Sequence, residues 1–154
     1  MRKAQTLLTI TFCLLLGVAC NKEERITGDP SPSVSNVPAI SLGSMSATYS
    51  EFDDITLFVN YEDGNGDIGF ADADSAVVYA TDNRDEILFT FHVPPLSPEG
   101  VEVTIQGTVE IVVENVVLLN QSENAETTTF TVQMVDRAGN WSNEVTTPTL
   151  TINP

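Results

Sequence analysis

The sequence predicts an all-β domain, an antiparallel β-sandwich of seven or eight short strands, over residues 37–154. Three observations predict this fold class. Several segments alternate apolar and polar residues, which is the period of a strand with one buried face. Thr and Val are abundant, whereas helix-forming runs of Ala, Leu, Glu and Lys are missing. Turn-forming Gly, Pro, Asn and Asp separate the segments.

The expected strands follow one another along the chain. Residues 55–61 alternate most clearly, with Ile55, Leu57, Val59 and Tyr61 on one face. Residues 101–105 and 108–113 are expected to form a long pair that bends around Gln106 and Gly107. The other expected strands cover residues 39–45, 76–80, 87–93, 129–135 and 144–152.

Residues 1–19 have the pattern of a cleaved secretory signal. Arg2 and Lys3 precede an apolar run from Leu7 to Val18. That run is shorter than the roughly 20 residues that a membrane-spanning helix needs. Small residues then lead to Cys20. The alternative is an ordinary signal peptide with an incidental cysteine.

The stretch from Leu16 to Cys20 resembles the lipobox of bacterial lipoproteins, although Gly17 stands where that family usually has Leu. The resemblance implies that the signal is cut before Cys20 and that the Cys20 thiol carries diacylglycerol. The membrane is then a partner through the lipid, whose acyl chains contribute about 0.8 kcal/mol per buried CH₂. Cys13 leaves with the signal, so the mature chain has no disulfide.

Residues 20–36 are predicted to be the lipidated cysteine and a flexible linker, because Pro and Ser dominate residues 29–33 without an apolar period. The charged stretch Asn21-Lys22-Glu23-Glu24 resembles the surface-export signal of Bacteroidota lipoproteins. This resemblance implies an outer-membrane location on the outward-facing leaflet. A charged tether without export information is the alternative.

The C-terminal part, Val132 to Asn143, resembles the last hairpin of bacterial immunoglobulin-like and fibronectin III-like domains. In its turn Asp136 can accept from backbone amides, and Gly139 and Asn140 tolerate positive φ. The resemblance implies an immunoglobulin-like sandwich over residues 37–154. The order of segments is similar to that of small uncharacterised Bacteroidota lipoproteins, which implies no known activity.

An acidic, glycine-rich turn is the strongest candidate site. Asp63, Asn65 and Asp67 stand at alternate positions, as in the opening of Ca²⁺ loops, where such oxygens converge on one ion. We expect Asp72 and Asp74 to supply further ligands to a structural Ca²⁺ ion. The same residue types also form ordinary turns, so a turn without an ion is the alternative.

Four other residues have side chains whose roles can be predicted from their chemistry. Arg84 and Arg137 are expected to pair with nearby carboxylates, and His92 to be a partly exposed strand residue. Trp141 is expected in the core or at the rim of the sandwich. Its alternative role is a platform for sugars, with Phe70 nearby.

Composition excludes several classes of function. The net charge of −16 leaves no basic surface for nucleic acid. One His, and the lack of a phosphate loop, a nucleophile elbow or paired metal-ligating cysteines, predict that the protein is not an enzyme. We expect an interaction or accessory module of the cell envelope that binds an envelope protein or a glycan. The alternative is a carbohydrate-binding accessory lipoprotein of a glycan-uptake system.

Overall fold

The computed structural model describes residues 33–154, which belong to one compact unit. This part of the chain is all-β and contains no helix. Accordingly, none of its segments is a helix long and apolar enough to cross a membrane. The predicted signal peptide, Cys20 and most of the predicted linker lie outside the described residues.

Ten strands form three sheets among the described residues, with strand orders β1-β3-β6, β2-β10-β7 and β5-β4-β8-β9. Only β2 and β10 pair in parallel, and all other strand pairs there are antiparallel. The strands are β1 (Ala39–Leu42), β2 (Thr48–Ser50), β3 (Ile55–Asp63), β4 (Val78–Asp82), β5 (Leu88–Phe91), β6 (Ile105–Val113), β7 (Glu126–Thr128), β8 (Phe130–Met134), β9 (Val145–Thr146) and β10 (Leu150–Asn153).

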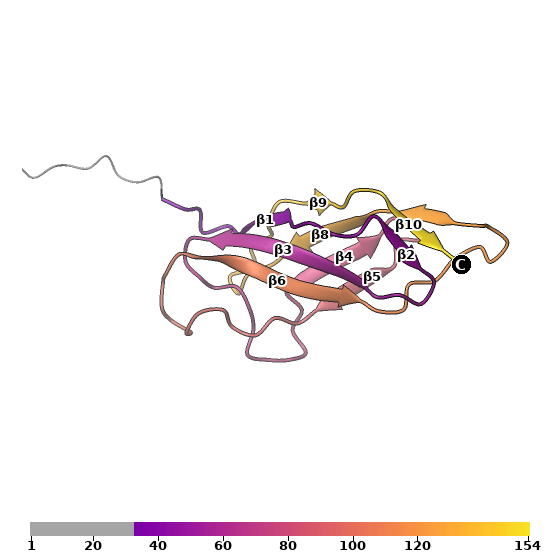
Figure 1. Cartoon of the computed structure of the whole chain (residues 1–154). Helices are drawn as coiled ribbons and strands as arrows, with labels where there is room; N and C mark the ends of the chain where they lie inside the picture. Colours follow the sequence, from indigo (N-terminus) through magenta and orange to yellow (C-terminus); the bar gives the residue numbers. More distant parts are fainter. Residues whose placement is uncertain (1–32) are drawn as a thin grey trace, which may run out of the picture. The chain divides into compact units, whose positions relative to one another are not determined.

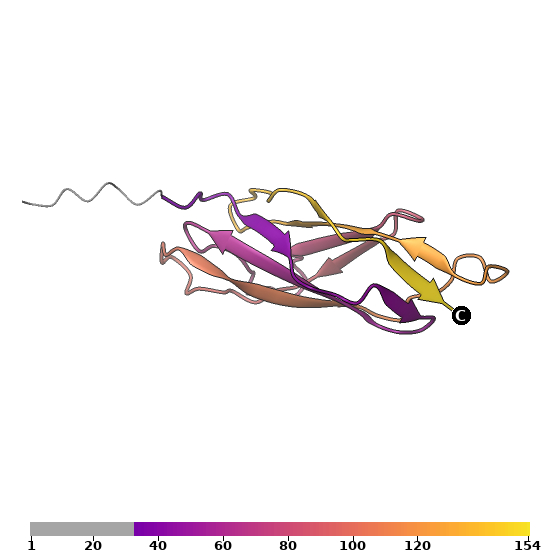
Figure 2. The ribbon, with the colours of Figure 1, turned by 45° about the horizontal axis from the view of Figure 1, so that its top comes forward.

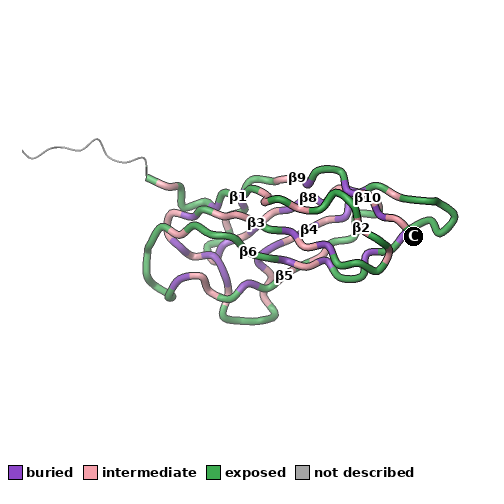
Figure 3. Tube along the Cα trace, in the orientation of Figure 1, coloured by how far each residue is buried: buried purple, intermediate pink, exposed green. Residues whose placement is uncertain are grey.

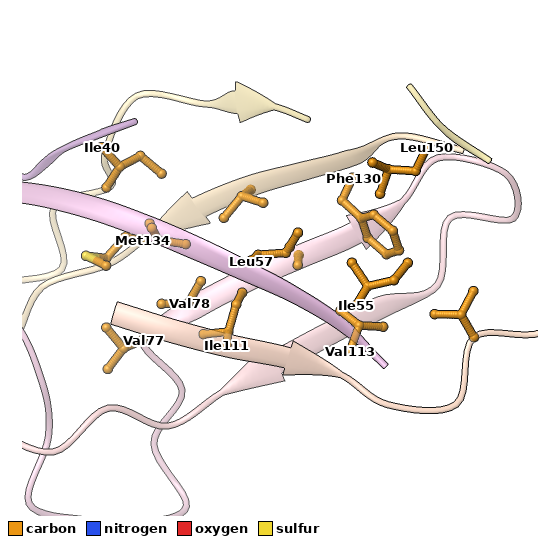
Figure 4. Close-up of a cluster of buried hydrophobic side chains, with 14 of the residues drawn as sticks. Ile40, Ile55, Leu57, Val77, Val78, Ile111, Val113, Phe130, Met134 and Leu150 are labelled. Atoms are coloured by element: carbon orange, nitrogen blue, oxygen red, sulfur yellow. The ribbon is translucent and has the colours of Figure 1, made fainter. Parts of the chain in front are cut away.

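The sheets lie in layers with the core between them. The long antiparallel pair β3–β6 lies over the sheet that contains β4 and β8 (Figures 1 and 2). Side chains from both layers meet in the space between, among them Leu57, Ile111, Val78 and Met134 (Figure 4). Buried positions alternate along the strands, whereas most loop residues are exposed (Figure 3). This architecture is consistent with a β-sandwich.

Alternation on β3 confirms the predicted inward face. Ile55, Leu57 and Val59 are fully buried, and each such side chain contributes about 1.5–3 kcal/mol through burial. On β8 the inward positions are Phe130, Val132 and Met134, also without exposed surface. Neither cysteine lies among the described residues, so this apolar core holds the layers together there.

The predicted bend at Gln106–Gly107 is wrong. Residues 101–104 are not a strand, and β6 runs unbroken through Gly107 opposite Tyr61. A Cβ atom on Gly107 would lie 2.7 Å from Oη of Tyr61. The glycine therefore makes room for a tyrosine ring on the neighbouring strand.

The strand count also differs from the seven or eight predicted. Strands β2 and β7 have three residues each, which is too few for an alternating pattern to be recognised. The last predicted strand, residues 144–152, is split into β9 and β10, which join different sheets. Pro148 lies between them and has no amide hydrogen to donate to a sheet.

Candidate functional site

Two aspartates occupy core-facing positions at the ends of two strands. Asp63 is the last residue of β3 and continues the inward series of Ile55, Leu57 and Val59. Asp136 follows β8 and continues the inward series that ends at Met134. Asp63 is 0% exposed and Asp136 is 1% exposed. Strand periodicity thus directs one carboxylate from each layer into the interior at the same end of the molecule.

Asp67 completes a three-carboxylate group with Asp63 and Asp136. One carboxylate oxygen from each residue lies within 4.8 Å of the other two. The isolated bridge between Ile68 and Asp136 holds the two chain segments together. The group therefore joins the turn after β3 to the turn after β8, which belong to different sheets.

Three buried side-chain oxygens in this turn have no hydrogen-bond partner: Oδ1 of Asp63, of Asn65 and of Asp67. They are the only buried side-chain polar atoms in this state among the described residues. A buried acceptor without a partner costs about 1–3 kcal/mol, and more when it is charged. Three such acceptors at alternate positions of one turn are an arrangement that a cation could bind.

The backbone of the turn, in contrast, is well partnered. The carbonyl of Asn65 accepts from the Val103 amide, and that of Asp67 accepts from the Arg137 amide. The Ser97 hydroxyl donates to the carbonyl of Gly66. Gly66 has φ of +72°, and a Cβ there would lie 2.4 Å from the carbonyl oxygen of Val103. These backbone contacts hold the turn in place together with the Asp63 carboxylate, whose Oδ2 accepts from the Asp67 amide at 3.0 Å.

Arg137 does not neutralise the three carboxylates. Its guanidinium donates to the carbonyl oxygens of Gly69 at 2.8 Å and of Ile68 at 3.4 Å. The predicted pairing of Arg137 with a carboxylate is therefore wrong. The ion pairs of the described chain both involve Arg84, which contacts Asp82 and Glu126 at the opposite end of the strands.

Asp82 is a buried carboxylate that does have a cationic partner, and it can be compared with Asp63. Like Asp63, it faces inward at the end of its strand, and it is 4% exposed. Arg84 contacts it at 2.6 Å, and the Thr128 hydroxyl donates to its other oxygen at 2.6 Å. The prediction that Arg84 pairs with carboxylates is confirmed. No described Arg or Lys forms an ion pair with the group around Asp63.

The electrostatics of the group favour a bound cation. Burial raises the pKa of the Asp63 carboxyl, and the negative charges of Asp67 and Asp136 raise it further, against the hydrogen bond from the Asp67 amide. Burial and the two neighbouring negative charges both destabilise the ionised form of Asp63. A cation between the carboxylates would remove the repulsion and stabilise the ionised form.

The ligand chemistry fits calcium. Carboxylate and amide oxygens are hard ligands, and the group contains no His or Cys. Ca²⁺ binds oxygens at about 2.3–2.6 Å, so two ligands of one ion lie up to about 5 Å apart. The three carboxylate oxygens lie within 4.8 Å of one another, so one ion could contact all of them.

The predicted ligand set is brought together only in part. Asp63, Asn65 and Asp67 share the turn, but Asp72 and Asp74 are exposed. The Asp72 carboxylate instead accepts from the Asp74 amide at 3.1 Å, in a turn of its own. For Asp136 the sequence predicts only a role in the turn, whereas the structure places its carboxylate in the acidic group. The alternation that ends at Met134 was the signal that could have shown it facing the interior.

A second feature lies on the outer face of the four-stranded sheet. Trp141 is 47% exposed, so it is not a core residue. Its ring lies 4.9 Å from that of Tyr79, centroid to centroid, with 55° between the ring planes. Phe70, in contrast, is partly buried and packs against the core. His92 is exposed, and its Nδ1 lies 3.0 Å from the Ser75 carbonyl oxygen.

Comparison with known proteins identifies no relative: no family model, no curated protein and no solved structure matches this chain.

Proposed function

We propose that this protein is a lipid-anchored, outward-facing module of the cell envelope that acts by binding rather than catalysis, and that a structural Ca²⁺ ion stabilises its immunoglobulin-like sandwich. The observation that carries the calcium part is the set of unpartnered oxygens of Asp63, Asn65 and Asp67 beside the buried carboxylate of Asp136. The lipid anchor is supported by the lipobox-like sequence that ends at Cys20.

The immunoglobulin-like assignment is supported by the order of the elements. Antiparallel strands form layers around one core, and the turn after β8 has the sequence Asp136-Arg-Ala-Gly-Asn140. Asp136 closes that turn, because its Oδ1 accepts from the Asn140 amide at 2.7 Å. Its Oδ2 accepts from the side-chain amide of Asn140 at 2.8 Å, so the carboxylate that closes the hairpin is the same one that faces the acidic group.

A bound Ca²⁺ ion would connect the two layers of the sandwich. A single ion held by Asp63 and Asp136 connects the ends of β3 and β8, which no disulfide connects among the described residues. Extracellular calcium modules bind with Kd values of about 10⁻⁴–10⁻³ M, which is the range expected for a structural site on an outward-facing domain.

The calcium site also lies close to the segment that leads from the tether. The Gly64 amide donates to the Ser35 carbonyl at 2.7 Å, and a Cβ on Gly64 would lie 2.4 Å from the Val34 carbonyl oxygen. Residues 33–36, predicted as the end of the linker, therefore pack on the acidic turn. An ion in that turn would stabilise the place where the anchored chain joins the sandwich.

The direct test of the calcium part is thermal unfolding in Ca²⁺ and in excess EDTA. A higher melting temperature in Ca²⁺ supports the proposal, and equal melting temperatures overturn it.

The anchor is tested by metabolic labelling with a fatty-acid probe in the cells that make the protein. We expect the wild-type protein to be labelled and the Cys20→Ser variant to lose all label, because that substitution removes the thiol that the lipid joins. Cys13→Ser is the matched control and should remain labelled. Label that persists in Cys20→Ser, or a wild type without label, contradicts the lipid anchor.

Carbohydrate binding is a second candidate for what the module binds. The observation that favours it is the exposed ring of Trp141 beside Tyr79 on the outer face of the sheet.

A further inference from the structure

We infer that the outer face of the β5-β4-β8-β9 sheet is a binding site for a neutral glycan, with Trp141 as its platform. This inference rests on the proposed role as an interaction module and names the class of its ligand. Strand alternation creates the face: Val78 and Ala80 point into the core, so Tyr79 and Thr81 between and beyond them point outward.

The face is hollowed around the aromatic pair. A groove of about 470 Å³ runs beside Trp141 and Tyr79, a volume within the range of about 300–1,000 Å³ typical of small-molecule sites. Leu88 lies along it with 53% of its surface exposed. The groove thus presents an apolar strip, which includes two aromatic rings, toward solvent.

Hydrogen-bonding groups surround this strip. Gln133 supplies an amide, and Glu86 and Glu144 supply carboxylates. Asn83 and Thr131 also line the groove, where the Asn83 amide donates to the Thr131 hydroxyl at 3.0 Å. A sugar ring has an apolar face of C–H groups and an edge of hydroxyls. An aromatic platform edged by amides and carboxylates complements both, because the ring covers the C–H face and the polar groups bond the hydroxyls.

The negative charge of the groove favours a neutral ligand over an anionic one. Of the residues in 33–154 that line the groove, two are glutamates and none is Arg, Lys or His. If the predicted signal is removed, Arg2 and Lys3 leave, and the net charge changes from −16 to −18. A glycan that carries carboxylates or sulfates would be repelled by this surface, whereas an uncharged glycan would not.

The topology disfavours an extended peptide as the ligand. Strands β4 and β8 are the central strands of this sheet, and each pairs with a neighbour on both sides. Their backbone amides and carbonyls are used within the sheet, so a peptide cannot add to them as a further strand. Only side chains are available on this face.

Affinity electrophoresis of the purified full chain, in gels that contain a soluble neutral β-glucan, xylan or α-mannan, tests the inference. We expect at least one of these polysaccharides to retard the wild type, and polygalacturonate not to do so. Trp141→Ala should weaken binding at least tenfold, which corresponds to about 1.4 kcal/mol. Gln133→Ala, a smaller change, should weaken the same interaction without removing an aromatic ring.

Phe58→Ala is the matched control, because Phe58 is 37% exposed on β3, in a different sheet. It should be retarded like the wild type. Trp141 is the only tryptophan of the chain, so its fluorescence reports directly on the groove of the wild type. We expect the emission to shift saturably to shorter wavelength with the polysaccharide that retards the protein.

Four outcomes overturn the inference: no retardation by any of the three neutral polysaccharides, equal retardation of Trp141→Ala, retardation by polygalacturonate instead, or binding of a protein at this face with no polysaccharide bound. The calcium and lipid measurements are separate. A protein that melts higher in Ca²⁺ and carries lipid but binds no glycan refutes this inference alone.

Discussion

Calcium is expected to raise the melting temperature of the wild-type protein by about 10 °C. For a site with a Kd of about 10⁻⁴ M, about 10 mM Ca²⁺ stabilises the folded state by about 2.7 kcal/mol. For a domain of this size, 1 kcal/mol corresponds to roughly 3–5 °C. The measurement is thermal unfolding followed by circular dichroism, in Ca²⁺ and in excess EDTA. NaCl must keep the ionic strength equal, because salt alone screens the repulsion within a strongly acidic protein.

Asp63→Asn is expected to raise the melting temperature in EDTA and to lower it in Ca²⁺, relative to the wild type. In EDTA the variant should melt higher than the wild type, because one buried charge is removed and the amide oxygen can still accept from the Asp67 amide. In Ca²⁺ it should melt lower, because a carboxylate ligand is lost. A purely structural carboxylate would give the same sign in both conditions.

Asp72→Asn and Asp74→Asn are the matched controls, because both residues lie in the same acidic sequence but outside the buried group. They should retain the full calcium response. Asp136→Asn should lose the response, and it should also be less stable in EDTA because Asp136 accepts from the side chain of Asn140. If Ca²⁺ raises the melting temperature of Asp63→Asn as much as that of the wild type, the ion does not bind at Asp63 and the proposed site is wrong.

Arg84→Met is expected to destabilise the protein by about 3–5 kcal/mol, or roughly 10–20 °C in melting temperature. The reason is that Asp82 and Arg84 have only 6% and 12% of their side-chain surfaces exposed. Removal of the guanidinium leaves the Asp82 charge buried with only the Thr128 hydroxyl and a backbone amide as partners. The contact from Arg84 to the Val117 carbonyl is lost as well. Chemical denaturation measures the loss.

The double variant Arg84→Met/Asp82→Asn is the matched control. It should recover part of the lost stability, because the buried charge is removed together with its partner. If the double variant is no more stable than Arg84→Met, the loss comes from packing of the arginine side chain and not from the uncompensated carboxylate.

The pH dependence of stability follows from the same network. Burial by itself would raise the pKa of Asp82, but the hydrogen bonds from Arg84 and Thr128 outweigh it, so the pKa is lowered. A carboxyl whose pKa is lowered by folding stabilises the protein above its unfolded pKa of about 3.9 and loses that contribution as the pH falls through the folded pKa. Acid titration should therefore show a smaller loss of stability below pH about 4 in Asp82→Asn than in the wild type.

The accuracy of the sequence-based predictions depended on whether a feature is local. Alternation over the nine residues of β3 was enough to predict its buried face, because side-chain direction in a strand is a local property. Strands β2 and β7 could not be predicted in this way. They are three residues long and are strands because β10 lies between them in the sheet.

The exposure of Trp141 also could not be predicted from the residues next to it in the sequence. It follows a turn and pairs with Val135 in an isolated bridge, so no strand pattern assigns its direction. Its contact with Tyr79 comes from strand β4, far away in the chain. Only the pairing of β4 with β8 brings the two rings to one face.

By itself, the sequence determined the all-β character of the domain, its strongly acidic surface and the alternate spacing of Asp63, Asn65 and Asp67, because these depend on composition and on neighbouring residues. Only the tertiary structure decided that Asp136 joins them and that Asp72 and Asp74 do not. Which strand ends meet depends on how two sheets pack over a shared core. That packing is set by contacts between residues distant in the chain, about which local spacing carries no information.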